Sequence, residues 1–244
     1  MAPPRVVSIL APRAMRLAVA VAPCVVLSIA CTDFATPAEL EKPTILAVTA
    51  DPPVVAAGGD ARLDTVVVDG SGVLTGLTTS YRLVETYAGV APIGRLAVDG
   101  GVTRYVAPDE VPTLPGGAPP IDTVEVTVDG AGDRPMTALK AMAVAPAATA
   151  NPTIARLGVG DGDGLAGPLR VRHGDTLALE VATDPPADEA ARFAWYTVAG
   201  EIERYQSNPC ELIVGDEARS GWLFVVVRDG KGGVAWRGVE LQVE

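Results

Sequence analysis

The sequence contains few of the residues on which metal sites, disulfides and most hydrolytic active sites depend. Its 244 residues include three cysteines and one histidine, His173. A Ser-His-Asp triad needs a nucleophile within hydrogen-bond reach of the imidazole, and no G-x-S-x-G, H-E-x-x-H or phosphate-binding glycine motif is present. We therefore expect a protein that is not an enzyme, with no catalytic residue and no cofactor. His173 is expected to be an exposed turn residue.

Cysteine is too scarce for a disulfide in the folded body. Cys24 and Cys31 lie in or at the end of an apolar N-terminal stretch, which leaves Cys210 alone in the rest of the chain. A single thiol cannot form an intrachain disulfide. We expect Cys210 to be a small buried residue and the stability of the fold to come from its core.

Basic residues are also scarce. Nineteen Lys and Arg residues stand against thirty Asp and Glu residues, a net charge of −11, and only three of the basic residues are lysines. Residues 1–30 contain three arginines and no acid, so the chain from Cys31 onward has sixteen basic and thirty acidic residues, a net charge of −14. This balance excludes a nucleic-acid partner, which needs a basic surface. Its simplest consequence is solubility.

Long apolar runs are absent except for one near the N-terminus. Arg13 and Arg16 precede the apolar run Leu17–Ala30, which ends in small residues. The run has fourteen residues, fewer than the roughly 20 that a membrane-spanning helix needs, and Pro23 interrupts it. The pattern predicts a secretory signal peptide over residues 1–30.

The residues before Cys31 carry a second signal. The segment Leu27–Cys31, LSIAC, resembles the lipobox of bacterial lipoproteins, although Ser28 stands where that family usually has leucine. The resemblance implies cleavage before Cys31 and acylation of its thiol and its new amine by palmitate-type chains. An ordinary cleaved signal peptide and an uncleaved N-terminal anchor are the alternatives. Two acyl chains give stable membrane attachment, whereas one gives only reversible attachment.

The lipoprotein resemblance also implies an address. Translation starts at Met1 or at Met15, since residues 15–30 form a complete short signal peptide. The mature chain is then lipid-anchored to the cell envelope, and residues 31–42 form a polar lipidated tether. Thr32 stands where some bacteria use aspartate to retain lipoproteins in the inner membrane. The resemblance therefore favours the outer membrane, on its periplasmic face or at the cell surface.

Two units repeat one another after the tether, as tandem domains do. Each opens with Pro-Thr-Ile and continues with a proline, a Gly-Asp pair, an aspartate and an Asp-Gly pair. The matching positions are Pro43 and Pro152, Pro53 and Pro168, Gly59–Asp60 and Gly174–Asp175, Asp69 and Asp184, and Asp129–Gly130 and Asp229–Gly230. We expect domains at 43–146 and 152–244, with 147–151 as the linker.

Both units are rich in short β-strand patterns, and neither shows a helical repeat. Apolar residues alternate clearly at 124/126/128, 177/179/181 and 239/241/243. The expected strands are 44–49, 61–68, 80–87, 94–98, 103–107, 122–128 and 137–144, then 153–159, 169–172, 176–182, 192–198, 202–206, 210–214, 222–228 and 234–243. About seven strands in each unit of about 100 residues predict an all-β fold of two β-sandwiches.

The second unit resembles an immunoglobulin-like domain. Phe193-Ala194-Trp195 looks like strand C, whose tryptophan packs between the sheets, and residues 216–224 look like the entry to strand F. The resemblance implies that Trp222 takes the place of a corner tyrosine and Phe224 that of the second core cysteine. The whole chain is similar to lipoproteins of GC-rich Gram-negative bacteria with tandem immunoglobulin-like domains, of PKD-like or fibronectin type III-like kind.

That assignment creates a candidate partner surface. If Phe224 points inward, its neighbours on the same strand point outward. With one residue of the final strand they would form an apolar surface: Leu223, Val225, Val227 and Trp236. Contiguous exposed apolar surface marks an interface. The alternative is that the other domain, a loop or a neighbouring side chain covers it.

One loop is a weak candidate for calcium binding. Asp161 and Asp163 alternate with glycines, and closely spaced carboxylates in a turn can supply oxygen ligands to calcium. The loop continues without the further acids of a full calcium-binding loop, so a plain turn is the alternative.

The sequence thus predicts a non-enzymatic, membrane-anchored envelope lipoprotein that acts as a structural spacer or as an adhesion or protein-binding module. The alternative is a carbohydrate- or peptide-binding accessory subunit of an envelope complex. In that case the second unit would bind, because it holds all three tryptophans, Trp195, Trp222 and Trp236. The expected partners are an envelope protein or a glycan, and the membrane through the lipid on Cys31.

Overall fold

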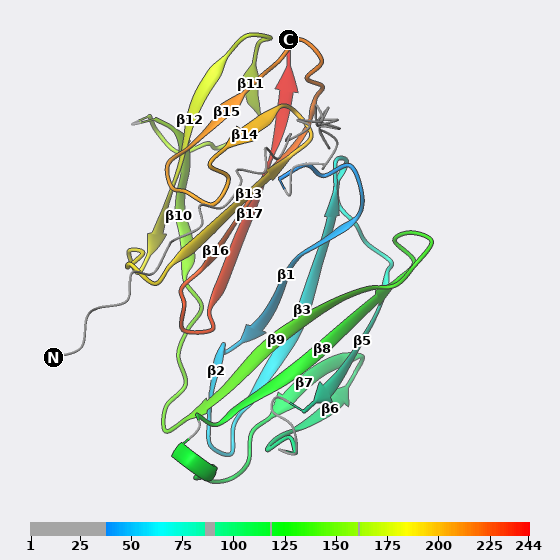
Figure 1. Cartoon of the computed structure of the whole chain (residues 1–244), viewed down its shortest axis with the longest axis vertical. Coiled ribbons are helices and arrows are strands. Elements are labelled where there is room, and N and C mark those ends of the chain that lie inside the picture. Colours follow the sequence, from blue (N-terminus) through cyan, green and yellow to red (C-terminus); the bar gives the residue numbers. More distant parts are fainter. Residues whose placement is uncertain (1–37, 86–90, 118, 161) are drawn as a thin grey trace, which may run out of the picture. The chain divides into compact units, whose positions relative to one another are not determined.

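The computed structural model describes residues 38–85, 91–117, 119–160 and 162–244, which fold as β-strands joined by turns (Figure 1). These residues form seventeen strands and one 3-10 turn, η1 (Pro115–Gly117), and contain no α-helix. The predicted all-β fold is confirmed. In the described ranges, no helix has the length and apolar character that a membrane span requires.

The first nine strands form two sheets around one core. They are β1 (Thr44–Asp51), β2 (Val54–Ala56), β3 (Asp60–Asp69), β4 (Gly72–Val73), β5 (Thr78–Val84), β6 (Arg95–Asp99), β7 (Val102–Val106), β8 (Ile121–Asp129) and β9 (Met136–Ala145). One sheet has the order β1-β3-β7-β6, with β4 paired to β3, and the other has the order β2-β9-β8-β5. Side chains from both sheets form a single buried cluster. We call this unit the first sandwich.

The remaining eight strands form the second sandwich in the same way. They are β10 (Thr153–Val159), β11 (Leu169–Val171), β12 (Thr176–Asp184), β13 (Arg192–Thr197), β14 (Glu201–Glu203), β15 (Cys210–Ile213), β16 (Gly221–Arg228) and β17 (Val234–Val243). The two sheets have the orders β10-β12-β15-β14 and β11-β17-β16-β13. A second buried cluster lies between them.

The two sandwiches share one topology. In each, the first strand pairs antiparallel with the next long strand, as β1 does with β3 and β10 with β12. A short strand then joins the opposite sheet and pairs parallel with the last strand, as β2 does with β9 and β11 with β17. Apart from this short strand, and from the two-residue β4 in the first sandwich, four strands lie in one sheet and three in the other. This is the ABED and CFG arrangement of constant-type immunoglobulin domains. The chain therefore folds as tandem immunoglobulin-like sandwiches.

The prolines of the sequence repeat mark the point where the chain changes sheet in each sandwich. Pro53 and Pro168 directly precede β2 and β11, the strands that change sheet. Proline has no N–H to give to a ladder, so it is tolerated at the start of such a strand and not within it. All fifteen strands expected from the sequence overlap strands of the structure. The two that were missed, β2 and β4, have three and two residues, too few to show alternation.

Alternation along β8 shows why these residues form a sandwich. The side chains of Val124, Val126 and Val128 are almost fully buried, and those between them are only partly buried. Burying one such side chain contributes about 1.5–3 kcal/mol. A residue period of two therefore places one apolar face of β8 against the opposite sheet and leaves a polar face outside.

A different aromatic residue lies at the centre of each core. Trp195 is fully buried in the second sandwich, as predicted for strand C, and its Nε1 donates to the Ser207 carbonyl at 2.9 Å. In the first sandwich Tyr105 is fully buried, and its hydroxyl donates to Oδ2 of Asp122 at 2.9 Å. That carboxylate also accepts hydrogen bonds from the backbone N–H groups of Ile93 and Gly94, at 2.9 and 2.7 Å.

The segment before the first sandwich packs on the second sandwich. Ala38 and Leu40 are 3% and 1% exposed. The Thr197 N–H of β13 donates to the Ala38 carbonyl at 2.9 Å, and the Leu40 N–H donates to the Thr197 carbonyl at 3.2 Å. Glu39 and Thr197 form a parallel bridge. The end of the segment expected to be a polar tether is therefore part of the folded body, at the β13 edge of a sheet.

Candidate functional site

The outward and inward faces of β16 are the reverse of those expected. Leu223, Val225 and Val227 are at most 1% exposed and belong to the core of the second sandwich. Phe224 and Val226 point to the opposite face. The predicted partner surface of Leu223, Val225 and Val227 is therefore wrong in its orientation. Phe224 does not take the core position that the immunoglobulin-like resemblance implied.

The cause of this reversal is that β16 is apolar on both faces. The five residues from Leu223 to Val227 are all buried, so alternation in the sequence cannot set the phase. The phase comes from pairing, because directly opposed residues of antiparallel strands lie on one face. Leu223 pairs with Val239 of β17, which lies in the core of the second sandwich.

The outward face of β16 is covered within the chain. Phe224 and Val226 cluster with Leu40, with Leu46 of β1 and with Val68 of β3. Residues at the margin of this cluster are partly buried: Val66, Tyr196, Val198, Trp222, Val234 and Trp236. Both sandwiches and the segment before them contribute, and they belong to one compact unit. We call this cluster the inter-sandwich core.

Close packing shapes the inter-sandwich core. The rings of Trp222 and Phe224 stack, with centroids 5.7 Å apart and planes at 15°. Phe224 lies over Gly238 of β17, where a Cβ atom would come within 2.6 Å of the ring. Gly70 fits against Val198, where a Cβ atom would come within 2.8 Å of a methyl group. Glycine at these two positions allows the close approach.

Hydrogen bonds from the linker also join the two sandwiches. Asn151 donates through Nδ2 to the Ala50 carbonyl of β1 at 2.7 Å, and its Oδ1 accepts from the Val234 N–H of β17 at 2.9 Å. One linker side chain thus holds a strand of each sandwich.

All three tryptophans of the second sandwich take part in packing, Trp195 fully buried and the other two partly buried. Trp195 lies in its core, and Trp222 and Trp236 lie at the inter-sandwich core. A flat glycan or peptide site built on these rings, as the alternative function required, would have to compete with that packing. Trp222 packs at this interface and does not sit at a corner of the second core.

The two residues considered for chemistry have local structural environments. His173 is exposed, and its Nδ1 lies 2.9 Å from the Gly215 carbonyl. Cys210 is fully buried, and burial raises the pKa of its thiol to about 12. A thiol with that pKa stays protonated at neutral pH and is a poor nucleophile. Both residues lie where they were expected.

The other predicted sites are only partly within the described residues. Asp163 is exposed, and Asp161 lies outside the described residues. In this loop Arg156 donates to the Gly162 carbonyl at 2.8 Å. Across the described ranges, no group of three or more His, Cys, Asp or Glu residues is placed to hold a metal ion. Cys31 also lies outside the described residues, so its lipidation stays a prediction.

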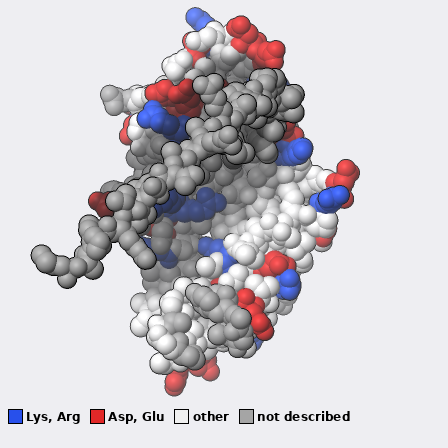
Figure 2. Space-filling view, in the orientation of Figure 1, with Lys and Arg blue, Asp and Glu red and all other residues white. Residues whose placement is uncertain are grey.

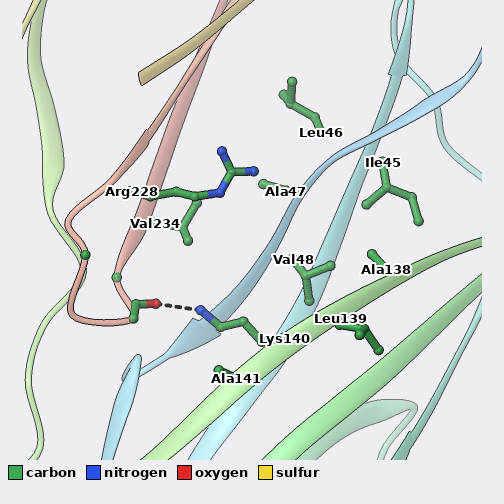
Figure 3. Close-up of a pocket in the computed structure, with 13 residues that line it drawn as sticks. Ile45, Leu46, Ala47, Val48, Ala138, Leu139, Lys140, Ala141, Arg228 and Val234 are labelled. Carbon is green, nitrogen blue, oxygen red and sulfur yellow. Dashed lines mark hydrogen bonds between the residues drawn. The ribbon is translucent and has the colours of Figure 1, made fainter. Parts of the chain in front are cut away.

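A pocket that the sequence did not indicate lies beside the inter-sandwich core (Figure 3). Its volume is about 360 Å³. Figure 3 shows it bordered by β1, by β9 and by the turn that joins β16 to β17. Apolar side chains from β1 and β9 line one side, and Lys140 and Arg228 contribute two cations.

Lys140 is the least expected residue of this pocket. It is 7% exposed, and its Nζ donates to the Gly232 carbonyl at 2.5 Å. Burial lowers the pKa of Lys140 below its ordinary value, Asp229 opposes that effect, and Arg228 adds to it. The signal in the sequence was a lysine between Ala138 and Met142, among the inward positions of an alternating strand.

Comparisons with known proteins identify no family. No protein-family model matches the chain, and no curated protein sequence matches it. Similar solved structures include tandem Ig repeats of Dlar (15% identity, 84% of this chain and 98% of that chain, TM-score 0.32). They also include the titin domains z1z2 in complex with telethonin (18%, 83% and 96%, TM-score 0.24). A third is the N-terminal Ig1-2 module of the Drosophila receptor protein tyrosine phosphatase DLAR (13%, 83% and 99%, TM-score 0.28). The fold assignment rests on the strand order and not on these scores.

Proposed function

We propose that this protein is a non-enzymatic lipoprotein of the cell envelope, anchored through Cys31, and that its two sandwiches act together as a rigid spacer or protein-binding module. The observation that carries the proposal is the inter-sandwich core. It joins both sandwiches and the segment just before β1, through Leu40, into one unit. Two domains joined by a flexible linker would move independently of the membrane anchor. Two packed domains keep a fixed orientation, so a binding surface on either one stays at a fixed distance from the anchor.

The packing of Ala38 and Leu40 supports a specific placement on the membrane. Cys31 and Ala38 are seven positions apart, with six residues between them, a span of at most about 25 Å when fully extended. Because this segment meets β13, the second sandwich is the one held near the lipid. The first sandwich, although earlier in the sequence, is then the unit free to extend from the membrane.

The charge of the body agrees with an anchored protein that contacts the bilayer only through lipid. Net charge is −11 for the whole chain, and anionic headgroups repel an acidic body. Figure 2 shows acidic and basic side chains interspersed on one face of the molecule. We propose the outer membrane as its location, on the sequence grounds given for Thr32.

Mass spectrometry of the protein purified from its native membrane tests this function. We expect a mature chain that begins at Cys31 and carries acyl chains on that residue, recovered in the outer-membrane fraction. Cys31→Ala should remove the acyl chains and leave an unprocessed precursor. Cys24→Ala is the matched control, because Cys24 lies within the predicted signal peptide, and it should change neither result. An unmodified N-terminus in the native protein would refute the anchor.

A further inference from the structure

The pocket beside the inter-sandwich core has an apolar side and two basic lining residues. One side is apolar, with Ile45, Ala47 and Val48 of β1 and Ala138 of β9. Leu139 lines it as well and is 67% exposed. Pockets of about 300–1,000 Å³ with apolar walls and a few convergent polar groups are the usual form of small-molecule sites.

Two cations meet this apolar wall. Lys140 enters from β9, and Figure 3 shows the Arg228 side chain extending from β16 toward Ala47 on β1. Neither cation has a carboxylate oxygen within 4.0 Å in the described part of the chain, where the seven ion pairs involve other residues. Asp229 attracts Lys140 from beyond ion-pair distance, and Arg228 repels it. An anion placed between Lys140 and Arg228 would be attracted by both cations.

Asp229, the carboxylate that attracts Lys140, uses one of its oxygens to hold the adjoining turn. Oδ1 of Asp229 accepts from the backbone N–H groups of Lys231 and Gly233, at 2.7 and 2.8 Å. It therefore stabilises the turn between β16 and β17. The same turn presents the Gly232 carbonyl, which accepts a hydrogen bond from the ammonium of Lys140. An ammonium has three N–H donors, so Lys140 can give further hydrogen bonds to a ligand.

We propose that this pocket binds a small amphiphile with a single carboxylate and an unbranched apolar chain. The carboxylate lies between Lys140 and Arg228, where it accepts charge-assisted hydrogen bonds. The apolar chain lies along the side chains of β1 and β9 and covers Leu139. A doubly charged anion without an apolar chain would leave that wall exposed to water, and an uncharged chain would gain nothing from the attraction of the two cations.

Decanoate binding to the chain from Thr32 to Glu244 tests the proposal. That chain keeps the compact unit Ala35–Glu244 and lacks both Cys31 and the apolar run before it, so neither lipid nor detergent enters the measurement. Isothermal titration calorimetry should show saturable one-to-one binding below the concentration at which decanoate forms micelles. Decanol and inorganic phosphate are the two comparison probes, and each should bind roughly tenfold or more weakly. Equal binding of decanol or of phosphate, or no binding of decanoate, would overturn the proposal.

Three variants locate the site. Lys140→Met and Arg228→Gln should each weaken decanoate binding roughly tenfold. Arg170→Gln is the matched control. Arg170 is exposed, forms an ion pair with Glu244 at 3.4 Å and does not line the pocket. If Lys140→Met disturbs folding, Ala141→Phe decides the matter. Ala141 is an exposed lining residue, so the larger side chain should fill the pocket, keep both cations and abolish binding. Decanoate affinity that survives Ala141→Phe would contradict the proposed site.

Discussion

The two sandwiches have one strand order but opposite outer surfaces on the sheet that holds the last strand. In the first sandwich the outward residues of β8 include Glu125 and Thr127, and Arg82 of β5 donates to Glu125 at 2.7 Å. In the second sandwich the outward residues of β16 are Trp222, Phe224 and Val226. One outer face is thus polar, and the other is a packing surface.

This difference shows that the inward and outward residues of a strand have separate roles. Inward alternation on each strand decides that a sandwich forms, and it is present in both units. The outward residues decide whether the sheet then faces solvent or another part of the chain. The same topology therefore gives one sheet with a solvent face and one sheet buried on both faces.

Trp195→Ala should have the largest effect and tests whether the second core depends on its central ring. The change removes a fully buried indole and its hydrogen bond to Ser207. We expect the free energy of unfolding to fall by about 3–5 kcal/mol, as for other large-to-small changes of buried aromatic residues. Urea unfolding followed by circular dichroism measures this. An unchanged midpoint would show that Trp195 is not central to the core.

Val226→Asp should have the next largest effect and tests the contrast between the outer faces directly. It places a carboxylate in the inter-sandwich core, where an unpaired charge is costly. We expect a loss of about 3 kcal/mol and separation of one unfolding transition into two. The matched control is Thr127→Asp on the outward face of β8, which should leave unfolding unchanged. If both variants behave alike, the two faces do not differ as described.

Leu40→Ala tests the contribution of the segment before β1. Leu40 is 1% exposed and lies in the inter-sandwich core. We expect destabilisation of about 2–3 kcal/mol and faster hydrogen exchange of the Thr197 amide, which donates to the Ala38 carbonyl. Glu41→Ala, at an exposed neighbouring position, is the control. Unaltered protection of Thr197 in Leu40→Ala would mean that the segment does not depend on Leu40 for its position.

The sequence predicted most of the fold because its signals were local. The paired prolines, the Gly-Asp and Asp-Gly turns and the alternation of Val124, Val126 and Val128 each involve neighbouring residues. The orientation of β16 was not local, because Leu223 to Val227 are apolar at every position. Only the register with β17 distinguishes the two faces.

The pocket and the packed tether could not be predicted for the same reason. Lys140 meets Gly232 across 92 positions of sequence, and Leu40 meets Phe224 across a longer separation. Neither pairing leaves a periodic pattern. The sequence did contain one hint, a lysine in an inward position of β9, since a buried lysine needs a partner.

Tyr105→Phe should have the smallest effect. It tests how much the hydrogen bond between Tyr105 and Asp122 stabilises the first core, for comparison with the loss of the whole Trp195 ring from the second. It removes one of the hydrogen bonds to the buried Asp122 carboxylate, which should cost about 1–2 kcal/mol at neutral pH.

Burial, and then the charge of Asp122 and the hydrogen bond to it, raise the pKa of the Tyr105 hydroxyl above its ordinary value. The unfolded chain therefore ionises first as pH rises above about 10, and stability present below that pH is lost above it. Tyr81 and Tyr196 also have raised pKa values, so the variant should keep part of this loss. Urea unfolding at pH 9 and pH 11 measures the difference, and an equally steep loss in Tyr105→Phe and the unaltered protein would contradict a role for this hydroxyl.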